Sequence, residues 1–405
     1  MKTTPVEFFS EGDRIAGLWR TPDGDGPFRA IVQGPGWLGL KDAKLYVRYH
    51  EALVAAGFGV LVFDYRGFGD SGGDRGILSP VRQLQDLVNA VTYLTIRDDV
   101  IADAIGVFGT GGTGGGNAVL LADADPRVRA AVSQVPVADG ADWLHRMRPE
   151  HEWLSFLAGL EEDRRARVAT GTGRLVHPRE EIMVPTPERR ATKIKADVDD
   201  RIPSAVPLSA ADEILAYRPI DAAERLTTPL LVIGVEGDAT TPTDHAERLY
   251  EAAQGPKQLI MQRHTTHYAA YDRYWTQTTP RIVDWLDRHV QPSDVVVRTA
   301  AADGAAEVAD AGGNAVDCAL AAALVAMNTE PGVCALAGGA YVTVSAPGVP
   351  AVTFDGNVAV PGHGRDPDRL GRGTESVTMD YGGGITTLVG PGSVAVPGSL
   401  AAVDA

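Results

Sequence analysis

The stretch that most constrains this chain is the run from Ala104 to Leu120, in which an apolar segment meets a glycine cluster. A helical pattern rich in apolar residues follows, so the run predicts a strand, a sharp turn and a helix. Glycine relieves the strain of such a turn, whose tip is held above the sheet. Counted from the strand the tip is Gly111, and counted back from the glycines it is Gly112. Neither carries a nucleophile, and the nearest hydroxyls are those of Thr110 and Thr113.

Strand-like runs alternate with helical patterns along most of residues 1–292. The run Pro229 to Val235 is apolar at nearly every position, as in a strand buried on both faces of a parallel sheet. Opening strands are predicted at Val6 to Arg20 and at Phe28 to Gln33. We therefore predict an α/β fold with a doubly wound, mostly parallel sheet and a site at the carboxyl ends of its strands.

Motifs at the ends of these strands carry a family resemblance. Asp64-Tyr65-Arg66-Gly67-Phe68-Gly69-Asp70-Ser71 closely resembles the Asp-Tyr-Arg-Gly-x-Gly-x-Ser segment of the alpha/beta hydrolase superfamily. Gly237-Asp238, with Pro242 four residues later, and His267-Tyr268 are similar to that superfamily's acid and histidine segments. The resemblance covers residues 1–292 and implies the alpha/beta hydrolase fold.

The resemblance also implies catalytic roles. Asp238 is the expected acid and His267 the expected base, because this fold carries them after its seventh and eighth strands. The loop that follows the third strand supplies an N–H to the oxyanion hole, which implies the N–H of Trp37 or Leu38. His264 is an alternative base that lies nearer its strand.

The nucleophile remains open. Thr113 is the predicted nucleophile because Gly111-Gly112-Thr113-Gly114-Gly115 fits the Gly-x-nucleophile-x-Gly spacing, although a β-branched side chain is stiff for such a turn. A second version of the hypothesis needs no nucleophilic side chain, and His267 then acts as general base on a water or on a carbon acid. Asp238 as a helix cap is the structural alternative, and Asp244 and His245 are expected in the first turn of the next helix.

Residues 137–219 interrupt the alternation of strands and helices. They are rich in charges, prolines and tryptophan, with helical pieces near Trp143 to Leu160 and Ala210 to Tyr217. Hydrolases of the resembled fold carry a lid between strands six and seven, so we expect a helical cap that shapes an acyl pocket.

Composition narrows the classes of partner. A net charge of −16 argues against nucleic acid or an anionic membrane, and the sequence holds no run long enough to span a bilayer. Cys318 and Cys334 form no disulfide framework, which favours a reducing cytoplasm. We expect no cofactor, and no metal, because no histidine, cysteine and carboxylate cluster has ligand spacing.

From about Val295 the amino-acid composition of the chain changes. Ala305 to Ala319 resembles the N-terminal part of gamma-glutamyltranspeptidase, an N-terminal-nucleophile hydrolase, and the likeness continues through four later motifs. These are Glu330-Pro331, Gly338-Gly339, Phe354-Asp355-Gly356-Asn357 and Gly392 to Gly398. We therefore expect two domains, 1–292 and 293–405, the second an incomplete α+β segment of that fold.

Two departures from that family matter. Asn357 stands where the family has an arginine that binds the α-carboxylate of the donor substrate. An amide cannot replace the positive charge and the two parallel hydrogen bonds of a guanidinium. The sequence also stops at Ala405, before the family's catalytic threonine. We expect a second chain or a homo-oligomer to complete this fold.

The leading functional hypothesis is an alpha/beta hydrolase that acts on a small-molecule ester, amide or other acyl substrate. A non-catalytic scaffold and a histidine-dependent lyase or isomerase remain alternatives, as does a subunit of a gamma-glutamyltranspeptidase-like acyltransferase. Whether the glycine at the elbow is natural or engineered is left open by the sequence.

Overall fold

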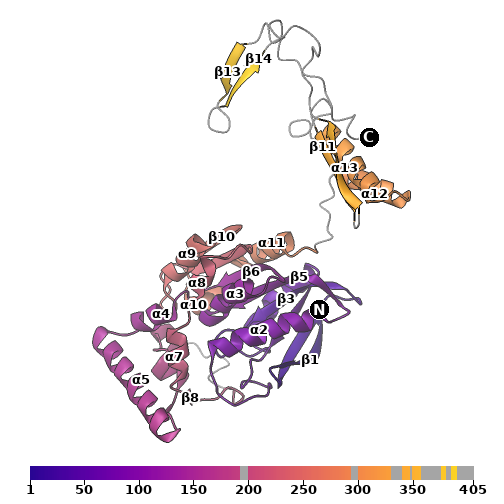
Figure 1. Cartoon of the computed structure of the whole chain (residues 1–405). Helices are drawn as coiled ribbons and strands as arrows, with labels where there is room; N and C mark the ends of the chain where they lie inside the picture. The colour runs from indigo at the N-terminus through magenta and orange to yellow at the C-terminus, as the bar shows by residue number, and fades with distance from the viewer. Residues whose placement is uncertain are drawn as a thin grey trace, which may run out of the picture. The chain divides into compact units, whose positions relative to one another are not determined.

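The computed structural model describes residues 1–191, 199–292, 300–329, 340–346, 349–356, 375–379 and 385–389. They fall into two compact units, Met1–Ser293 and Asp294–Ala405, which Figure 1 labels by element. In the described part of the chain, no helix is both long and apolar enough to cross a membrane.

An eight-stranded sheet forms the centre of the first unit. Its strands, in chain order, are β1 (Lys2–Ser10), β2 (Asp13–Thr21), β3 (Phe28–Gly34), β4 (Phe58–Phe63), β5 (Val100–Thr110), β6 (Val128–Gln134), β9 (Leu230–Val235) and β10 (Lys257–Gln262). They are arranged in the order β1-β2-β4-β3-β5-β6-β9-β10. The pairs β1–β2 and β2–β4 are antiparallel and all others are parallel. The predicted mostly parallel sheet is confirmed.

Helices cover both faces of this sheet, as a doubly wound fold requires. One face packs against α2 (Pro80–Thr95), α3 (Gly112–Ala124), α8 (Pro219–Ala223) and α9 (Thr243–Ala252). The other packs against α1 (Lys44–Ala55), α10 (His267–Asp272) and α11 (Thr279–His289). Within β9, Leu230 and Val232 enter one core while Leu231 and Ile233 enter the other, which explains its continuous apolar sequence.

The opening of the chain is a hairpin. Residues 6–20 divide between β1 and β2 at Glu11 and Gly12, which have φ values of 50° and 88°. Two successive positive φ angles give the type I′ turn that matches the twist of antiparallel strands.

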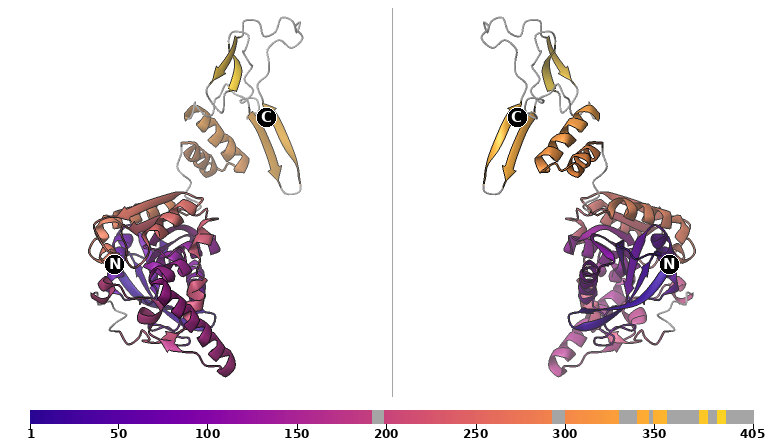
Figure 2. Two further views of the ribbon diagram at one scale, coloured as in Figure 1. Left: turned by 90° about the vertical axis from the view of Figure 1, so that its left-hand side faces the viewer. Right: turned by 90° about the vertical axis from the view of Figure 1, so that its right-hand side faces the viewer.

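Residues 137–191 and 199–219 lie between β6 and β9, where the helical cap is predicted, and the cap itself stays a prediction. The helices of this stretch are α4 (Gly140–Arg146), α5 (Glu150–Thr170), a π-helix (Pro178–Ile182), α6 (Pro187–Ala191) and α7 (Ala210–Leu215). The short strands β7 (Leu175–Val176) and β8 (Val206–Pro207) pair with each other and not with the main sheet. Figures 1 and 2 show α5 projecting from the rest of the first unit.

The second unit holds three separate hairpins in its described part. They are α12 (Ala300–Asp310) with α13 (Ala315–Thr329), β11 (Ala340–Ala346) with β12 (Val349–Gly356), and β13 (Glu375–Met379) with β14 (Ile385–Val389). These hairpins do not show the predicted N-terminal-nucleophile-hydrolase architecture. Cys318 is half-buried in α13, whereas Cys334, Asn357 and the motifs at 330–331, 338–339 and 392–398 lie outside the described residues.

Candidate active site

The run around the glycine cluster folds as strand β5, a sharp turn and helix α3. Gly111 has φ 78° and ψ 168° and precedes the helix, whose first bond runs from the Gly115 N–H to the Gly111 carbonyl at 2.6 Å. A Cβ at Gly109 would lie 1.9 Å from the carbonyl oxygen of Gly114, so the close approach needs glycine there. The tip of the turn is therefore Gly111, the position obtained by counting from the strand.

Gly111 leaves room at the tip. The nearest atom to an added Cβ is the Cα of Gly36 at 3.6 Å, an ordinary contact distance. A Cβ at Gly112 would be tighter, at 3.0 Å from Val137 and 3.1 Å from Thr241. The space for a nucleophilic side chain thus exists at Gly111 but holds none.

The two threonines beside the tip differ in their surroundings. Thr110, at the end of β5, accepts a hydrogen bond from Gln33 Nε2 at 3.2 Å. Thr113 lies in the first turn of α3 rather than at the tip, and its side chain is buried in the pocket wall. Its role as nucleophile stays a prediction.

Asp238 and His267 are brought together at the carboxyl ends of β9 and β10. His267 Nδ1 lies 2.7 Å from Asp238 Oδ2. The other carboxylate oxygen accepts the N–H groups of Thr240 at 2.7 Å and Thr241 at 3.0 Å. The Thr241 hydroxyl donates to Oδ2 at 3.1 Å. Asp238 is thereby fixed in position beside the imidazole.

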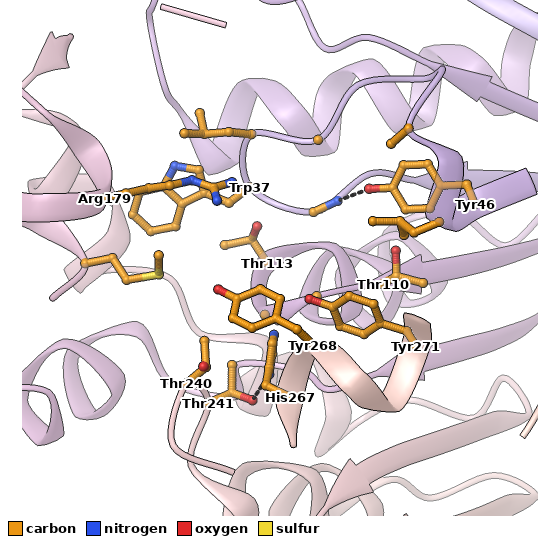
Figure 3. Close-up of a pocket in the computed structure, with 18 of the residues that line it drawn as sticks. Trp37, Tyr46, Thr110, Thr113, Arg179, Thr240, Thr241, His267, Tyr268 and Tyr271 are labelled. Atoms are coloured by element: carbon orange, nitrogen blue, oxygen red, sulfur yellow. Dashed lines mark hydrogen bonds between the residues drawn. The ribbon is translucent and has the colours of Figure 1, made fainter. Parts of the chain in front are cut away.

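This surrounding also sets the charge of the pair. Burial alone would raise the pKa of the Asp238 carboxyl, but His267 and the N–H donors of Thr240 and Thr241 hold that pKa below its usual range. The carboxylate therefore stays ionised and favours the tautomer with the proton on Nδ1. Nε2 of His267 is left facing the pocket, and Figure 3 shows the ring extending into it.

The pocket above the elbow has a volume of about 120 Å³ and is mostly apolar. Trp37 and Leu38 both line it, on the loop that follows β3. That loop is closed by a bond from the Gly39 N–H to the Gly36 carbonyl at 2.8 Å. The Gly36 N–H donates to the Tyr46 hydroxyl at 3.3 Å, as Figure 3 shows. The oxyanion role of Trp37 or Leu38 stays a prediction.

The Asp-Tyr-Arg-Gly segment holds this loop in place. Asp64 is fully buried and accepts the Lys41 N–H at 2.7 Å through one oxygen. Its other oxygen pairs with Lys41 Nζ at 2.5 Å and accepts the Asp70 N–H at 2.9 Å. A Cβ at Gly69 would lie 2.1 Å from that oxygen, so the motif's second glycine is needed to fit Asp64.

The alternative residues lie elsewhere. His264 is exposed in a positive-φ conformation and does not line the pocket. Asp244 and His245 lie in the first turn of α9, as expected. His245 accepts the Ala138 N–H at Nδ1 and approaches Asp142 at 2.8 Å through Nε2, so it serves packing rather than the pocket.

Asp142, Asp244 and His245 form a group, within the described residues, close enough to share a metal ion. Arg146 pairs with Asp142 at 2.9 Å and with Asp244 at 2.6 Å. Arg248 also approaches Asp142 at 3.3 Å, so two guanidiniums already balance the two carboxylates without an ion.

The cap adds residues that sequence reasoning missed. Arg179, in the π-helix, and Met183 line the pocket together with Tyr271 of α10. Glu188 of α6 accepts hydrogen bonds from the Thr266 hydroxyl and, at 3.3 Å, from the Tyr268 N–H. The cap is thus bonded to both residues that flank His267, a link that carries no signal in sequence spacing.

Several known proteins are similar in sequence to this chain. The X-Pro dipeptidyl-peptidase (S15 family) model matches residues 11–269. An uncharacterized 31.7 kDa protein in the traX-finO intergenic region of Escherichia coli is 29% identical over 283 residues, covering 69% of this chain and 97% of that protein. The quorum-quenching protein AidA of Acinetobacter baumannii is 33% identical over 145 residues, covering 36% of this chain and 47% of AidA.

Solved structures support the same fold. The alpha/beta hydrolase GrgF from Penicillium sp. sh18 matches with a TM-score of 0.59 and 22% identity, covering 72% of this chain and 99% of GrgF. The family match ends before the second unit, so the gamma-glutamyltranspeptidase resemblance gains no support from it. Because the family model spans well over half of the sequence, this chain belongs to the X-Pro dipeptidyl-peptidase (S15) family, a family of hydrolases with the alpha/beta hydrolase fold.

Proposed function

We propose that the protein hydrolyses an ester, amide or other acyl substrate with a water molecule that His267 activates directly. One observation carries the proposal: the Asp238–His267 pair, at 2.7 Å, faces a pocket whose elbow tip has space but no nucleophile. A scaffold would not need an ionised carboxylate buried against an imidazole, because burying charge costs free energy.

The proposed reaction has two steps. Nε2 of His267 takes a proton from a water above Gly111 as the water oxygen attacks the acyl carbon. The negative charge that forms on the carbonyl oxygen is stabilised by the N–H groups of Gly112 and of Trp37 or Leu38. The intermediate then collapses, and the imidazolium returns the proton to the leaving oxygen, nitrogen or sulfur. Asp238 stabilises the imidazolium throughout.

The test is hydrolysis of p-nitrophenyl acetate and butyrate by the parent and by His267→Ala, Asp238→Asn and Thr113→Val. General-base catalysis contributes ~10²–10⁴-fold, so we expect the His267 variant to lose a factor of that order. Thr113→Val is expected to retain turnover, because water is the nucleophile. Parent turnover no faster than that of His267→Ala would refute the proposal and favour the scaffold.

A covalent threonine route would give a different result. If Thr113 reacts, Thr113→Val abolishes turnover as completely as His267→Ala, and the parent releases a burst of p-nitrophenol from an acyl-enzyme. Lyase or isomerase chemistry would instead appear as His267-dependent exchange of a substrate C–H proton without ester cleavage.

For the second unit we propose a gamma-glutamyltranspeptidase-like segment that acts with a partner chain or a second copy in the cytoplasm. The proposal rests on the sequence resemblance that begins at Ala305 to Ala319. In this stretch Asn314 Oδ1 accepts the N–H groups of Val316 at 2.8 Å and Asp317 at 3.2 Å and so caps α13. Shortening the chain after residue 292 tests it. Unchanged ester hydrolysis together with loss of self-association or partner binding is expected.

A further inference from the structure

Three buried polar groups in the pocket have no hydrogen-bond partner among the residues that the structure describes. They are Trp37 Nε1, Thr113 Oγ1 and Thr240 Oγ1. Their residues are 9%, 3% and 7% exposed, and all three line the pocket. The hydroxyls of Thr110 and Thr241, which line the same pocket, are by contrast already bonded to Gln33 and Asp238.

Two of the three residues that carry these groups, Trp37 and Thr240, both contact Trp143. The ring of Trp37 packs edge-on against Trp143 with centroids 5.5 Å apart. The indole N–H of Trp143 in turn donates to the Thr240 carbonyl at 2.8 Å. Figure 3 shows Thr113 between Trp37 and His267, at the centre of the view. The residues that carry the three unmet groups therefore all line the space that the acyl part of a substrate would occupy.

An acyl group that is a plain hydrocarbon chain would leave these three groups without a hydrogen-bond partner. A site built to hydrogen-bond a substrate oxygen disfavours the analogue that lacks it, because its own polar groups then stay unpaired. The indole N–H can only donate, so the missing partner must be an acceptor, and a threonine hydroxyl serves an acceptor equally well.

We propose that the pocket selects acyl groups that carry an oxygen substituent, a hydroxyl or a keto group, which bonds to Trp37, Thr113 and Thr240. The inference rests on the proposed function, because it names the substrate class of the same site. The oxygen is additional to the scissile carbonyl, whose own donors are the proposed oxyanion N–H groups.

Binding can be measured apart from turnover. Butanamide, 3-hydroxybutanamide, 4-hydroxybutanamide and 3-oxobutanamide are neutral, and their affinities for the full chain can be compared by titration calorimetry. We expect at least one oxygenated amide to bind about tenfold tighter than butanamide or better, as one or two new hydrogen bonds give. Equal affinities for all four amides would overturn the inference and mean that water satisfies the three groups.

The variants locate the effect. Thr113→Val and Thr240→Val should each reduce the preference, whereas Thr110→Val, whose hydroxyl is already bonded, should leave the ratio unchanged. The first two should also raise the melting temperature of the free protein, because each removes an unpaired buried hydroxyl. A preference that survives both changes would refute the assignment.

Turnover then separates the two proposals. Amide selectivity without His267-dependent hydrolysis would sustain the pocket assignment and refute the proposed reaction. The opposite pattern is His267-dependent hydrolysis of p-nitrophenyl butyrate with no preference for its 3-hydroxy analogue and with equal amide affinities. It would sustain the proposed reaction and refute the pocket assignment.

Discussion

Replacing Gly111 by serine would put a hydroxyl at the tip of the turn between β5 and α3, in the pocket that holds His267. The change fits sterically, since the nearest atom to the new Cβ is Gly36 Cα at 3.6 Å. Its cost is conformational, because φ 78° with ψ 168° lies in a backbone region that is essentially restricted to glycine. A strained backbone of this kind costs about 1–3 kcal/mol, and for a domain of this size that lowers the melting temperature by ~2–12 °C.

The gain in rate should be large. Loss of the nucleophile from a serine triad costs ~10⁶ in kcat, and because the surroundings of Gly111 are not tuned to a serine we expect Gly111→Ser to recover at least ~10²-fold over the parent. Hydrolysis of p-nitrophenyl butyrate, followed from the first turnover, should show a burst equal to the enzyme concentration. The burst reports a serine acyl-enzyme that the parent does not form.

Two controls accompany this variant. Gly111→Ala carries the same backbone strain without an oxygen and so isolates the hydroxyl, and Gly171→Ser, at φ 74° and ψ 3° with open space around it, tests a serine in the ordinary left-handed region away from the pocket. If Gly111→Ser is no faster than Gly111→Ala and gives no burst, His267 is not aligned with the tip. The assignment of Gly111 as the nucleophile position would then be wrong.

Three further outcomes follow from packing and charge. Gly109→Ala should destabilise the protein by about 1–3 kcal/mol, since its Cβ would lie 1.9 Å from a backbone oxygen. Gly159→Ala in α5 should instead stabilise the protein by roughly 0.5–1 kcal/mol, because alanine favours a helix more than glycine does. Thermal unfolding of both variants checks that the two changes in stability have opposite signs. Burial and Arg20 hold the pKa of His50 well below its ordinary value, so the folded state resists its protonation. Stability should therefore fall as pH drops below about 6.5, the unfolded value, and His50→Gln should flatten urea-unfolding free energies between pH 7 and 5. Lys41→Met leaves the Asp64 carboxylate buried without its cation, so we expect a loss of about 3 kcal/mol and slower ester hydrolysis; an unchanged rate would show that this pair does not hold the oxyanion loop.

The sequence predicts structure best where the signal lies in neighbouring residues, and it predicts site residues best where they follow directly after a strand. The continuous apolar run of β9 signals a strand buried on both faces, and a parallel sheet then brings Asp238 and His267 to one edge. The tip of the turn was ambiguous because glycine fills several consecutive positions, and only backbone geometry distinguishes Gly111 from Gly112.

The cap contributes to the pocket in ways that spacing does not encode. Arg179 reaches the pocket from a π-helix, and Glu188 bonds to the residues beside His267 from a helix of five residues. Neither element shows an amphipathic period, because each is too short and packs through single contacts. The division of residues 6–20 into two strands was missed for a related reason: two turn residues suffice for a hairpin.

The bare tip at Gly111 also bears on how such a protein is detected. Fluorophosphonates and β-lactone reagents label serine hydrolases by bonding to the oxygen of an activated serine, and glycine offers them no such atom. A proteome survey that counts hydrolases by covalent capture would therefore pass over this chain even with the proposed water-based reaction at work. Reversible transition-state analogues, which the proposed oxyanion N–H groups and His267 would hold, are the reagents suited to finding it.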